Sequence, residues 1–467
     1  MLPVVLLASF MAQFDTFVVN VAAPSLRSNL HASDIALELI VGGYAFAYGS
    51  GMVTGGRLGD MYGHRRLFLI GMASFSLASL LCGLSNTPSE LVAARLLQGV
   101  TGALMVPQIL ALITAPFAPH EGGRTMAWFG VTAGIASVAG QILGGLLLDA
   151  DFLGLGWRTI FLINVPIGVI TIGLAWRLVP RVSNPRQASL DLLGTLGVSL
   201  SLALALIPLM LGRNEHWPAW TWICLVTSLP VITATMTWER KVARLGGQPL
   251  LNPALFRNRS FAVGLVINVA FMAFFGSFIF TLTLLLQSGL GLSALHAGLT
   301  FAPLGALLAT TSVLGRRLMG HYGLKILTLG AGISAVGVVT LAVELHVLAG
   351  SITTPWLVPP LALVGLGNGL VMPLLMGAVL AGVDPTQAGA AAGVLTTSQQ
   401  FANAAGVAVL GSVLFAALGG APTRTGFTSA MQLTAVLDLV LLLITIALTF
   451  LLPQNPARAK PLRGGAR

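Results

Sequence analysis

The sequence predicts an all-α polytopic membrane protein, and three properties of its composition and patterning support that prediction. Of 467 residues, 56% are hydrophobic and 8% are charged, whereas a soluble domain carries roughly 25% charged residues. The apolar runs are about 20 residues long, which is the length that a helix needs to cross a bilayer. They are continuous rather than alternating, which favours helices over the strands of a barrel.

Fourteen apolar segments are expected to cross the membrane. Their expected bounds are 3–23, 36–55, 67–85, 90–112, 126–148, 159–179, 191–211, 219–238, 261–285, 298–314, 326–347, 358–382, 389–418 and 432–452. The run 389–418 is longer than one crossing requires, so we expect a loop at its start.

Basic residues gather on one side of the predicted membrane. Nineteen of the 24 Lys and Arg residues lie in one set of alternate loops and in the C-terminal tail, four lie on the opposite side, and Arg95 lies within a span. Loops rich in Lys and Arg stay in the cytoplasm, so both termini are expected there, with the protein in the inner (plasma) membrane of the cell. This placement accounts for the net charge of +10 without a nucleic-acid partner.

The first span contains Asp15 midway along its length. A charged side chain at the bilayer centre costs about 2.5–3.5 kcal/mol on insertion scales, so it faces the protein interior and is functional by default. Asp15 is therefore a candidate to bind and release a proton, and the alternative is permanent pairing with a cation. That cation would be Arg95 of the fourth span, because the helical rise places the two side chains about 18 and 23 Å from the inner membrane face.

A glycine-rich basic segment, Gly56-Arg57-Leu58-Gly59-Asp60-Met61-Tyr62-Gly63-His64-Arg65-Arg66, follows the second span. It is expected to form a tight cytoplasmic loop that acts as a conformational clamp. Gly56 and Gly63 would permit the reversal, and Asp60 would bind backbone donors at a helix N-terminus or a nearby arginine. Arg65 and Arg66 would hold the loop at the cytoplasmic surface.

A related segment follows the second span of the C-terminal half. At an offset of 260 residues, Leu58, Tyr62, Gly63 and Arg65 match Leu318, Tyr322, Gly323 and Lys325. This internal repeat predicts two six-helix bundles, 1–190 and 261–452. Two extra helices and a cytoplasmic loop in 191–260 would separate the bundles, and 453–467 would form a basic cytoplasmic tail.

These segments together resemble the major facilitator superfamily of transporters. The spacing of the glycine-rich loop resembles the loop between that superfamily's second and third helices. The Arg95 segment resembles its fourth-helix motif, in which the arginine is implicated in proton coupling. The runs around Asp15, Trp157–Gly168 and Leu250–Phe261 resemble the branch of drug:proton antiporters with fourteen spans. The resemblance covers most of the chain and implies that Asp15 and Arg95 couple transport to protons.

The fifth span departs from the family pattern at one position. Its small residues resemble the helix-five packing motif of the family's exporters, and they are Gly130, Gly134, Gly140, Gly144 and Gly145. Small residues let membrane helices pack closely. Gln141 stands where that motif has proline, so the helix is expected to lose a kink and gain a polar group. Plain glycine-mediated packing is the alternative to a role in export.

Polar and aromatic residues within the spans are candidates to line a substrate cavity. They are Gln13, Asn20, Gln98, Phe275, Gln399 and Asn403. For the amides, hydrogen bonding between helices is an equal alternative. Phe275 shares one helix face with Phe271, Phe274 and Phe278, where a cationic drug could stack or where the rings could simply pack.

The resemblance implies a secondary active transporter rather than an enzyme. It would be a proton-coupled antiporter, of the multidrug efflux type, that exports amphipathic small molecules by alternating access. The proton gradient would drive it without a cofactor, and it would act as a monomer in the lipid bilayer. The sequence contains neither metal-ligand spacing nor a phosphate-binding loop. A proton-coupled uptake symporter and a translocator of lipids or envelope precursors remain as alternatives on the same fold.

Overall fold

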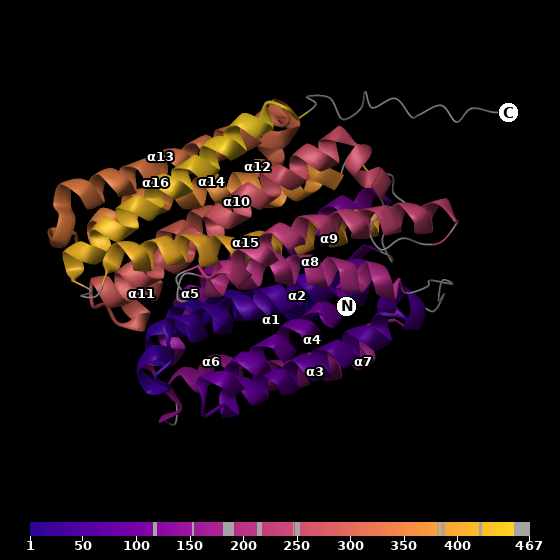
Figure 1. Cartoon of the computed structure of the whole chain (residues 1–467), viewed down its shortest axis with the longest axis horizontal. Helices are drawn as coiled ribbons and strands as arrows, with labels where there is room; N and C mark the ends of the chain where they lie inside the picture. Colours follow the sequence, from indigo (N-terminus) through magenta and orange to yellow (C-terminus); the bar gives the residue numbers. More distant parts are fainter. Residues whose placement is uncertain are drawn as a thin grey trace.

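The chain folds into long helices that pack side by side (Figure 1), as described by a computed structural model. The structure describes residues 1–114, 119–151, 154–180, 191–212, 217–245, 247, 253–380, 383, 388–419 and 423–452. Every regular element in these ranges is a helix. The predicted basic tail, 453–467, lies outside the described residues.

The helices of the N-terminal part are α1 (Leu2–Asn29), α2 (Asp34–Tyr62), α3 (His64–Leu84), α4 (Pro88–Thr114), α5 (Pro119–Asp149), the 3-10 turn η2 (Gly156–Arg158), α6 (Thr159–Leu162) and α7 (Asn164–Leu178). Next come α8 (Leu192–Leu211) and α9 (Ala219–Arg244). The C-terminal part comprises η3 (Pro253–Arg257), α10 (Arg259–Leu284), the π-helical turn η4 (Leu285–Gly289), α11 (Ala294–Thr300), α12 (Ala302–Tyr322), α13 (Lys325–Leu348), η5 (Ala349–Ser351), α14 (Thr354–Leu380), α15 (Ala388–Leu418) and α16 (Arg424–Thr449).

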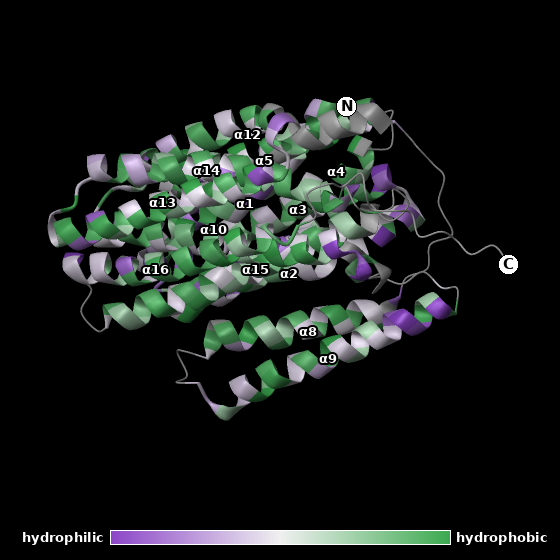
Figure 2. Ribbon diagram, turned by 90° about the horizontal axis from the view of Figure 1, so that it is seen from above, coloured by the Kyte–Doolittle hydropathy of each residue, from purple (hydrophilic) through white to green (hydrophobic). Residues whose placement is uncertain are grey.

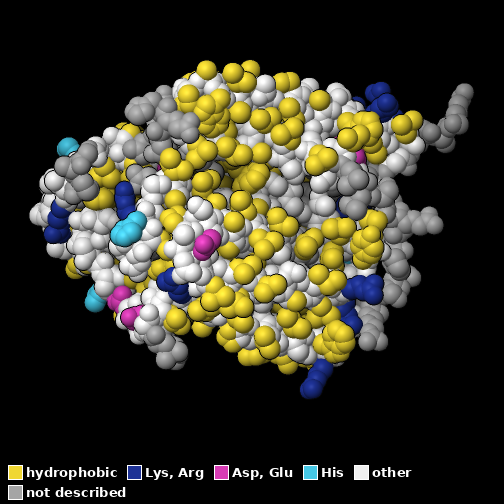
Figure 3. Space-filling model, turned by 60° about the horizontal axis from the view of Figure 1, so that its bottom comes forward, with side chains coloured by type: hydrophobic (Ala, Val, Ile, Leu, Met, Phe, Trp, Pro, Cys, Tyr) yellow, Lys and Arg dark blue, Asp and Glu magenta, His cyan; other side chains and the backbone are white. Residues whose placement is uncertain are grey.

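The lengths and compositions of these helices confirm the prediction of an all-α membrane protein. Within the described ranges, 12 helices are long and apolar enough to cross a membrane. Two shorter apolar stretches, Gly134–Asp149 of α5 and Leu193–Leu209 of α8, lie at further positions where spans are expected. Figure 3 shows a broad band of apolar side chains across one face, with Lys and Arg nearer its two ends.

Polar caps fix where several helices begin. The side chain of Ser33 accepts a hydrogen bond from Ala36 N at the start of α2 (3.2 Å). Asn258 accepts one from Ser260 N at the start of α10 (2.9 Å), and Asp191 accepts one from the N–H of Gly194 in α8 (2.8 Å). These side chains satisfy backbone donors that a helix cannot pair internally.

The helices pack in two groups. In the first, α2 packs on α4, α1 on α5, and α3 on α4 and α7; in the second, α10 packs on α15 and α16, and α13 on α14 and α16. The α8–α9 pair lies to one side (Figure 2), where α8 contacts α2 of the first group and α15 of the second. Of the apolar span in α10, 89% is buried, against 11% in α9. α10 is therefore a central helix, whereas α9 exposes most of its surface.

Two helix junctions are built alike, one in each group. α2 ends at Tyr62 and α3 begins at His64, with Gly63 between them at φ +92°. α12 ends at Tyr322, and Gly323, at φ +57°, leads towards α13. Glycine adopts positive φ without the steric cost that a side chain brings. Each of the two Tyr-Gly pairs that match in sequence thus ends a helix with a glycine at positive φ.

Several expected helix bounds are wrong, and two of them concern predicted loops. The segment after the second span is helical as far as Tyr62, so Gly56 and Asp60 lie in a helix and the chain reverses at Gly63. The helix continues because the small residues of α2 pack closely on α4. The run 389–418 forms one helix, α15, with no loop in its described part. Its first turns are helical because they are packed, with Ala391 and Leu395 fully buried.

Candidate functional site

Asp15 lies at the centre of a buried polar cluster, and its side chain is 0% exposed. Arg95 Nη1 donates to Asp15 Oδ2 at 2.5 Å. Gln98 Nε2 and Asn164 Nδ2 both donate to Asp15 Oδ1, each at 2.9 Å. The carboxylate therefore accepts one charge-assisted bond and two neutral ones, which is how a buried charge is stabilised.

Arg95 is also 0% exposed, and α2 provides two of its further contacts. Its Nε donates to the carbonyl oxygen of Ile40 at 3.0 Å. The guanidinium carbon lies 4.2 Å from the ring centroid of Tyr44, within the range of a cation–π interaction. Nη1 also donates to Gln98 Oε1 at 2.7 Å, while Nη2 has no hydrogen-bond partner in the described part of the chain.

The cluster joins five helices of the first group. Asp15 comes from α1, Arg95 and Gln98 from α4, and Asn164 from α7. Ser79 of α3 accepts from Gln98 Nε2 at 2.7 Å, and α2 contributes a carbonyl and a ring. The predicted pairing of Asp15 with Arg95 is present. Gln98, which was expected to line a substrate cavity, binds Asp15 instead.

Sequence reasoning missed two members of this cluster, Ser79 and Asn164. Asn164 lies within the run Trp157–Gly168, which resembles the antiporter branch as a whole segment. The signal was available, because Asn164 is a single amide within an apolar stretch. Ser79 carried no comparable signal, since serine is common in membrane helices.

A small polar space lies between the two groups of helices. It is lined by Thr16, Asn20, Val41, Gly42, Ala45, Gly276, Asn403, Ala404 and Val407. The oxygens Oδ1 of Asn20 and of Asn403 have no hydrogen-bond partner among the described residues. The space measures about 10 Å³, close to the smallest volume that holds a water molecule. In this conformation it is too small for an organic substrate, and its amide oxygens come from α1 and α15.

The remaining residues predicted to line a cavity have different surroundings. Gln399 donates to Asn268 Oδ1 at 3.1 Å and so ties α15 to α10. Phe275 meets Phe17 edge-on, with ring centroids 5.6 Å apart, and fills the contact between α10 and α1. Gln13 is half-buried in α1. Phe275 and its three neighbours on the same helix face are all buried, so these rings pack inside the protein.

The glycines of α5 lie where α5 meets helices of both groups. A Cβ on Gly140 would come within 3.1 Å of Phe14 O, and one on Gly144 within 2.6 Å of Val18 Cγ2, both in α1. A Cβ on Gly145 would overlap the carbonyl oxygen of Ala294 in α11. Gly134 faces Leu308 of α12, and Gly130 lies earlier in α5. Gly140 and Gly144 therefore allow close packing within the first group, whereas Gly134 and Gly145 allow close contact with the second group.

Gln141 lies among these glycines and is fully buried. Its Nε2 donates to the carbonyl oxygen of Phe17 in α1 at 3.2 Å. Its Oε1 lies 3.4 Å from Thr283 Oγ1 of α10, whose hydroxyl group also lies 2.7 Å from the carbonyl oxygen of Ile279. The amide therefore links a helix of the first group to the central helix of the second. α5 continues through this position without a proline.

The residues of the expected clamp surround the junction at Gly63. Asp60 Oδ1 lies 3.4 Å from His64 Nε2, and His64 Nδ1 lies 2.8 Å from Gln108 Oε1 of α4. Arg65 Nη2 donates to the carbonyl oxygen of Trp176 in α7 at 2.6 Å. Arg66 is exposed. The junction thus connects α2 and α3 to α4 and α7 through side chains.

Asp438 is one of the buried carboxyl groups that lie outside the predicted site. Asp438 of α16 is 0% exposed, and its Oδ1 lies 2.6 Å from Ser277 Oγ of α10. Oδ2 has no hydrogen-bond partner in the ranges that the structure describes. Those ranges also contain no group of three or more His, Cys, Asp or Glu side chains placed to hold a metal ion.

Comparisons with known proteins identify relatives of this chain. Residues 5–407 match the sequence profile described as Major Facilitator Superfamily. The chain is 39% identical to the probable actinorhodin transporter of Streptomyces coelicolor, over 91% of this chain and 74% of that protein. It is 34% identical to the cephamycin export protein of Amycolatopsis lactamdurans, over 96% of this chain and 92% of that protein. It is 32% identical to the puromycin resistance protein of Streptomyces alboniger, over 100% of this chain and 93% of that protein.

Solved structures share the same fold. An auto-inhibited peptide transporter of the POT family superposes with a TM-score of 0.67 at 17% identity, over 96% of both chains. A partially occluded, inward-open xylose transporter from E. coli superposes with a TM-score of 0.61 at 14% identity, over 94% of this chain and 97% of that one. At these identities the likeness extends to the fold alone.

Proposed function

The chain belongs to the major facilitator superfamily, and from this premise we propose that it exports amphipathic small molecules in exchange for protons. The relatives described above are named for transport of, export of or resistance to actinorhodin, cephamycin and puromycin. These names favour efflux over uptake. The observation that carries the proposed coupling is the buried pair of Asp15 and Arg95.

The pair offers a route from proton binding to conformational change. Protonation of Asp15 would remove the charge that Arg95 Nη1 contacts at 2.5 Å and would leave the guanidinium buried without a counter-ion. Such a state is costly, so a conformation that gives Arg95 another partner would be favoured. A proton and a substrate can be coupled only if each binds the two conformations with different affinity.

We further propose that the chain forms two six-helix bundles, 1–190 and 261–452, which rock against each other. The helices of 191–260 would bring the total to fourteen spans, with both termini and the tail in the cytoplasm. The support for rocking is the glycine-mediated contact of α5 with α11, a helix of the second group. In the plasma membrane a potential of 100 mV would supply about 2.3 kcal/mol for each charge moved, or about a 50-fold gradient of a neutral substrate.

The direction of transport tests this proposal. Everted and right-side-out membrane vesicles containing the protein would be energised, and accumulation of a fluorescent amphipathic cation would be followed in each. An exporter accumulates the cation in everted vesicles. Accumulation confined to right-side-out vesicles, and greater than in matched vesicles that lack the protein, would instead identify an uptake symporter.

A further inference from the structure

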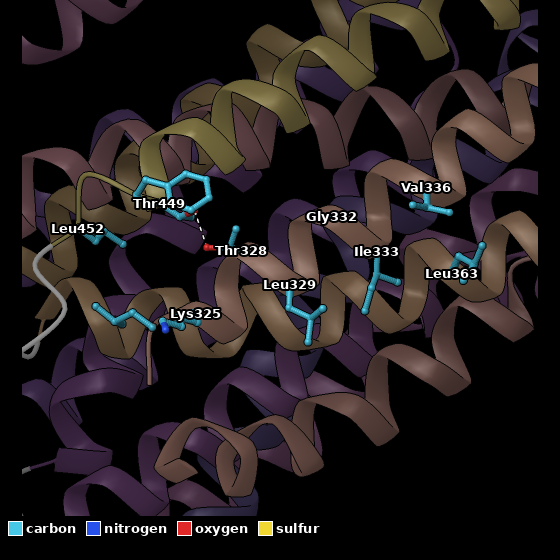
Figure 4. A pocket seen from close by; sticks show the side chains of 11 residues that line it. Lys325, Thr328, Leu329, Gly332, Ile333, Val336, Leu363, Thr449 and Leu452 are labelled. Carbon is cyan, nitrogen blue, oxygen red and sulfur yellow. Dashed lines mark hydrogen bonds between the residues drawn. The ribbon is translucent and has the colours of Figure 1, made fainter. Parts of the chain in front are cut away.

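An apolar groove lies on the outer surface of the second group, far along the chain from Asp15. It measures about 650 Å³ and lies between α13 and the end of α16, with Leu363 of α14 at one end. Figure 4 shows Lys325, Leu329 and Ile333 in a row along α13, followed by Leu363. The hydroxyl groups of Thr328 and Thr449 are 2.8 Å apart on its wall.

The groove has the length and openness of a site for a hydrocarbon chain. From Lys325 to Val336 a helix rises about 16 Å, roughly half the thickness of a bilayer core. Leu329 and Val336 are each 56% exposed and Phe450 is 71% exposed, so the groove opens to the membrane. Gly332 leaves its floor empty, because a Cβ there would meet no described atom within 4 Å.

One end of the groove carries a positive charge. Lys325 is exposed and makes no hydrogen bond or ion pair with the described part of the chain. With the orientation proposed above, it lies at the cytoplasmic face, where anionic lipid headgroups attract basic side chains by about 1 kcal/mol each.

In the first group of helices, the position that corresponds to this groove is closed. Arg65, which aligns with Lys325 in the internal repeat, donates to Trp176 O and lies 5.5 Å from the Trp176 ring. That contact joins α3 to α7, as α13 is joined to α16 in the second group. Where Arg65 has a partner within the protein, Lys325 borders an open groove.

We propose that this groove binds a phospholipid with an anionic headgroup, drawn from the cytoplasmic leaflet. One acyl chain lies along Leu329, Gly332 and Ile333, and the phosphate lies at Lys325. The two threonine hydroxyls already bond to each other, so the wall leaves an acyl chain no unpaired polar group there. The site is distinct from the transport pathway, because it opens sideways to the membrane.

Lipid retention tests the site directly. The full chain would be purified from bilayers containing equal amounts of phosphatidylglycerol and phosphatidylethanolamine, and the retained lipids counted by native mass spectrometry. Wild-type protein is expected to retain phosphatidylglycerol preferentially. Lys325→Gln is expected to reduce that preference about fivefold, which corresponds to about 1 kcal/mol, whereas Lys325→Arg is expected to keep it.

A matched pair of glycine substitutions locates the bound lipid. Gly332→Phe fills the groove and is expected to abolish preferential retention. Gly173→Phe is the control, because Gly173 of α7 is also helical and also has open space beside it. Equal retention by Gly332→Phe and Gly173→Phe would overturn the site, and equal retention of the two lipids by wild-type protein would overturn the anionic assignment. Displacement of the lipid by a transported cation would show that the groove takes substrate instead.

Discussion

Asp15 and Arg95 each depend on the other for burial. Removing one member leaves the other uncompensated, and breaking a buried pair in this way costs about 3–5 kcal/mol in soluble proteins. Asp15→Asn and Arg95→Gln are therefore each expected to lower the melting temperature, whereas the double variant recovers part of the loss. A double-mutant cycle measured by thermal unfolding in detergent checks this. Strictly additive losses would mean that the two side chains do not stabilise each other.

Asp438, unlike Asp15, is buried beside a serine rather than an arginine. Ser277 Oγ lies 2.6 Å from Asp438 Oδ1 and 2.9 Å from Phe274 O, but a hydroxyl group has one hydrogen to donate. Both contacts are hydrogen bonds only if the carboxyl group carries a proton and donates it to Ser277. The infrared spectrum of the wild-type protein is therefore expected to contain the carbonyl stretch of a protonated carboxylic acid that Asp438→Asn lacks. Identical spectra would show that Asp438 is ionised.

At the scale of the residue, the sequence predicted the charged pair but not its surroundings. A charge in an apolar span is visible without a structure, because its cost demands a partner or a function. Asn164 and Ser79 are neutral, and their roles depend on how α7 and α3 turn towards α1. That orientation is a property of helix packing, which no short sequence pattern records.

Two adjacent glycines of α2 differ in what surrounds them. A Cβ on Gly55 would overlap the carbonyl oxygen of Ala103 in α4, whereas a Cβ on Gly56 would lie 3.8 Å from Pro107 Cβ, an ordinary contact. Gly55→Ala is expected to cost about 1–3 kcal/mol through overpacking, and Gly56→Ala is expected to be tolerated. Comparison of the two melting temperatures tests this. A larger loss for Gly56→Ala would favour the loop that the sequence suggested.

The contact of α5 with α11 depends on Gly145. A methyl group there would overlap the backbone of Ala294, so Gly145→Ala is expected to separate the two helices. The distance between spin labels on exposed positions of α5 and α11 should increase relative to the wild-type protein. Gly173→Ala, which adds the same methyl group into open space, should leave that distance unchanged. No increase in Gly145→Ala would mean that this contact does not hold the two groups together.

At the scale of the element, helix positions followed from hydropathy, whereas several bounds did not. α2 continues past the end of its apolar stretch because its glycines pack against α4, and α15 carries the buried small residues Ala391 and Ala392 near its start. Polar or flexible residues predict a loop only when no neighbouring helix covers them. Of the two glycines expected to permit the reversal, Gly63 has a positive φ and Gly56 lies within a helix.

At the scale of the whole molecule, an internal repeat of ten residues indicated two related halves, and in both halves the matching Tyr-Gly pair ends a helix. The repeat could not reveal that α8 lies against α2 and α15, because that contact joins segments distant in sequence. The repeat also could not indicate that Arg65 contacts Trp176 in the first group, whereas the matching Lys325 of the second group borders an open groove.

The measurement that tests the central claim most directly is proton movement triggered by substrate in everted vesicles. With the lumen acidified, addition of an amphipathic cation is expected to release protons from vesicles containing the wild-type protein. Asp15→Asn should abolish the release. Asp151→Asn should retain it, since Asp151 is exposed and its amide would still accept the hydrogen bond from Gly156 N. Cation uptake without proton release, or full release in Asp15→Asn, would contradict coupling through Asp15.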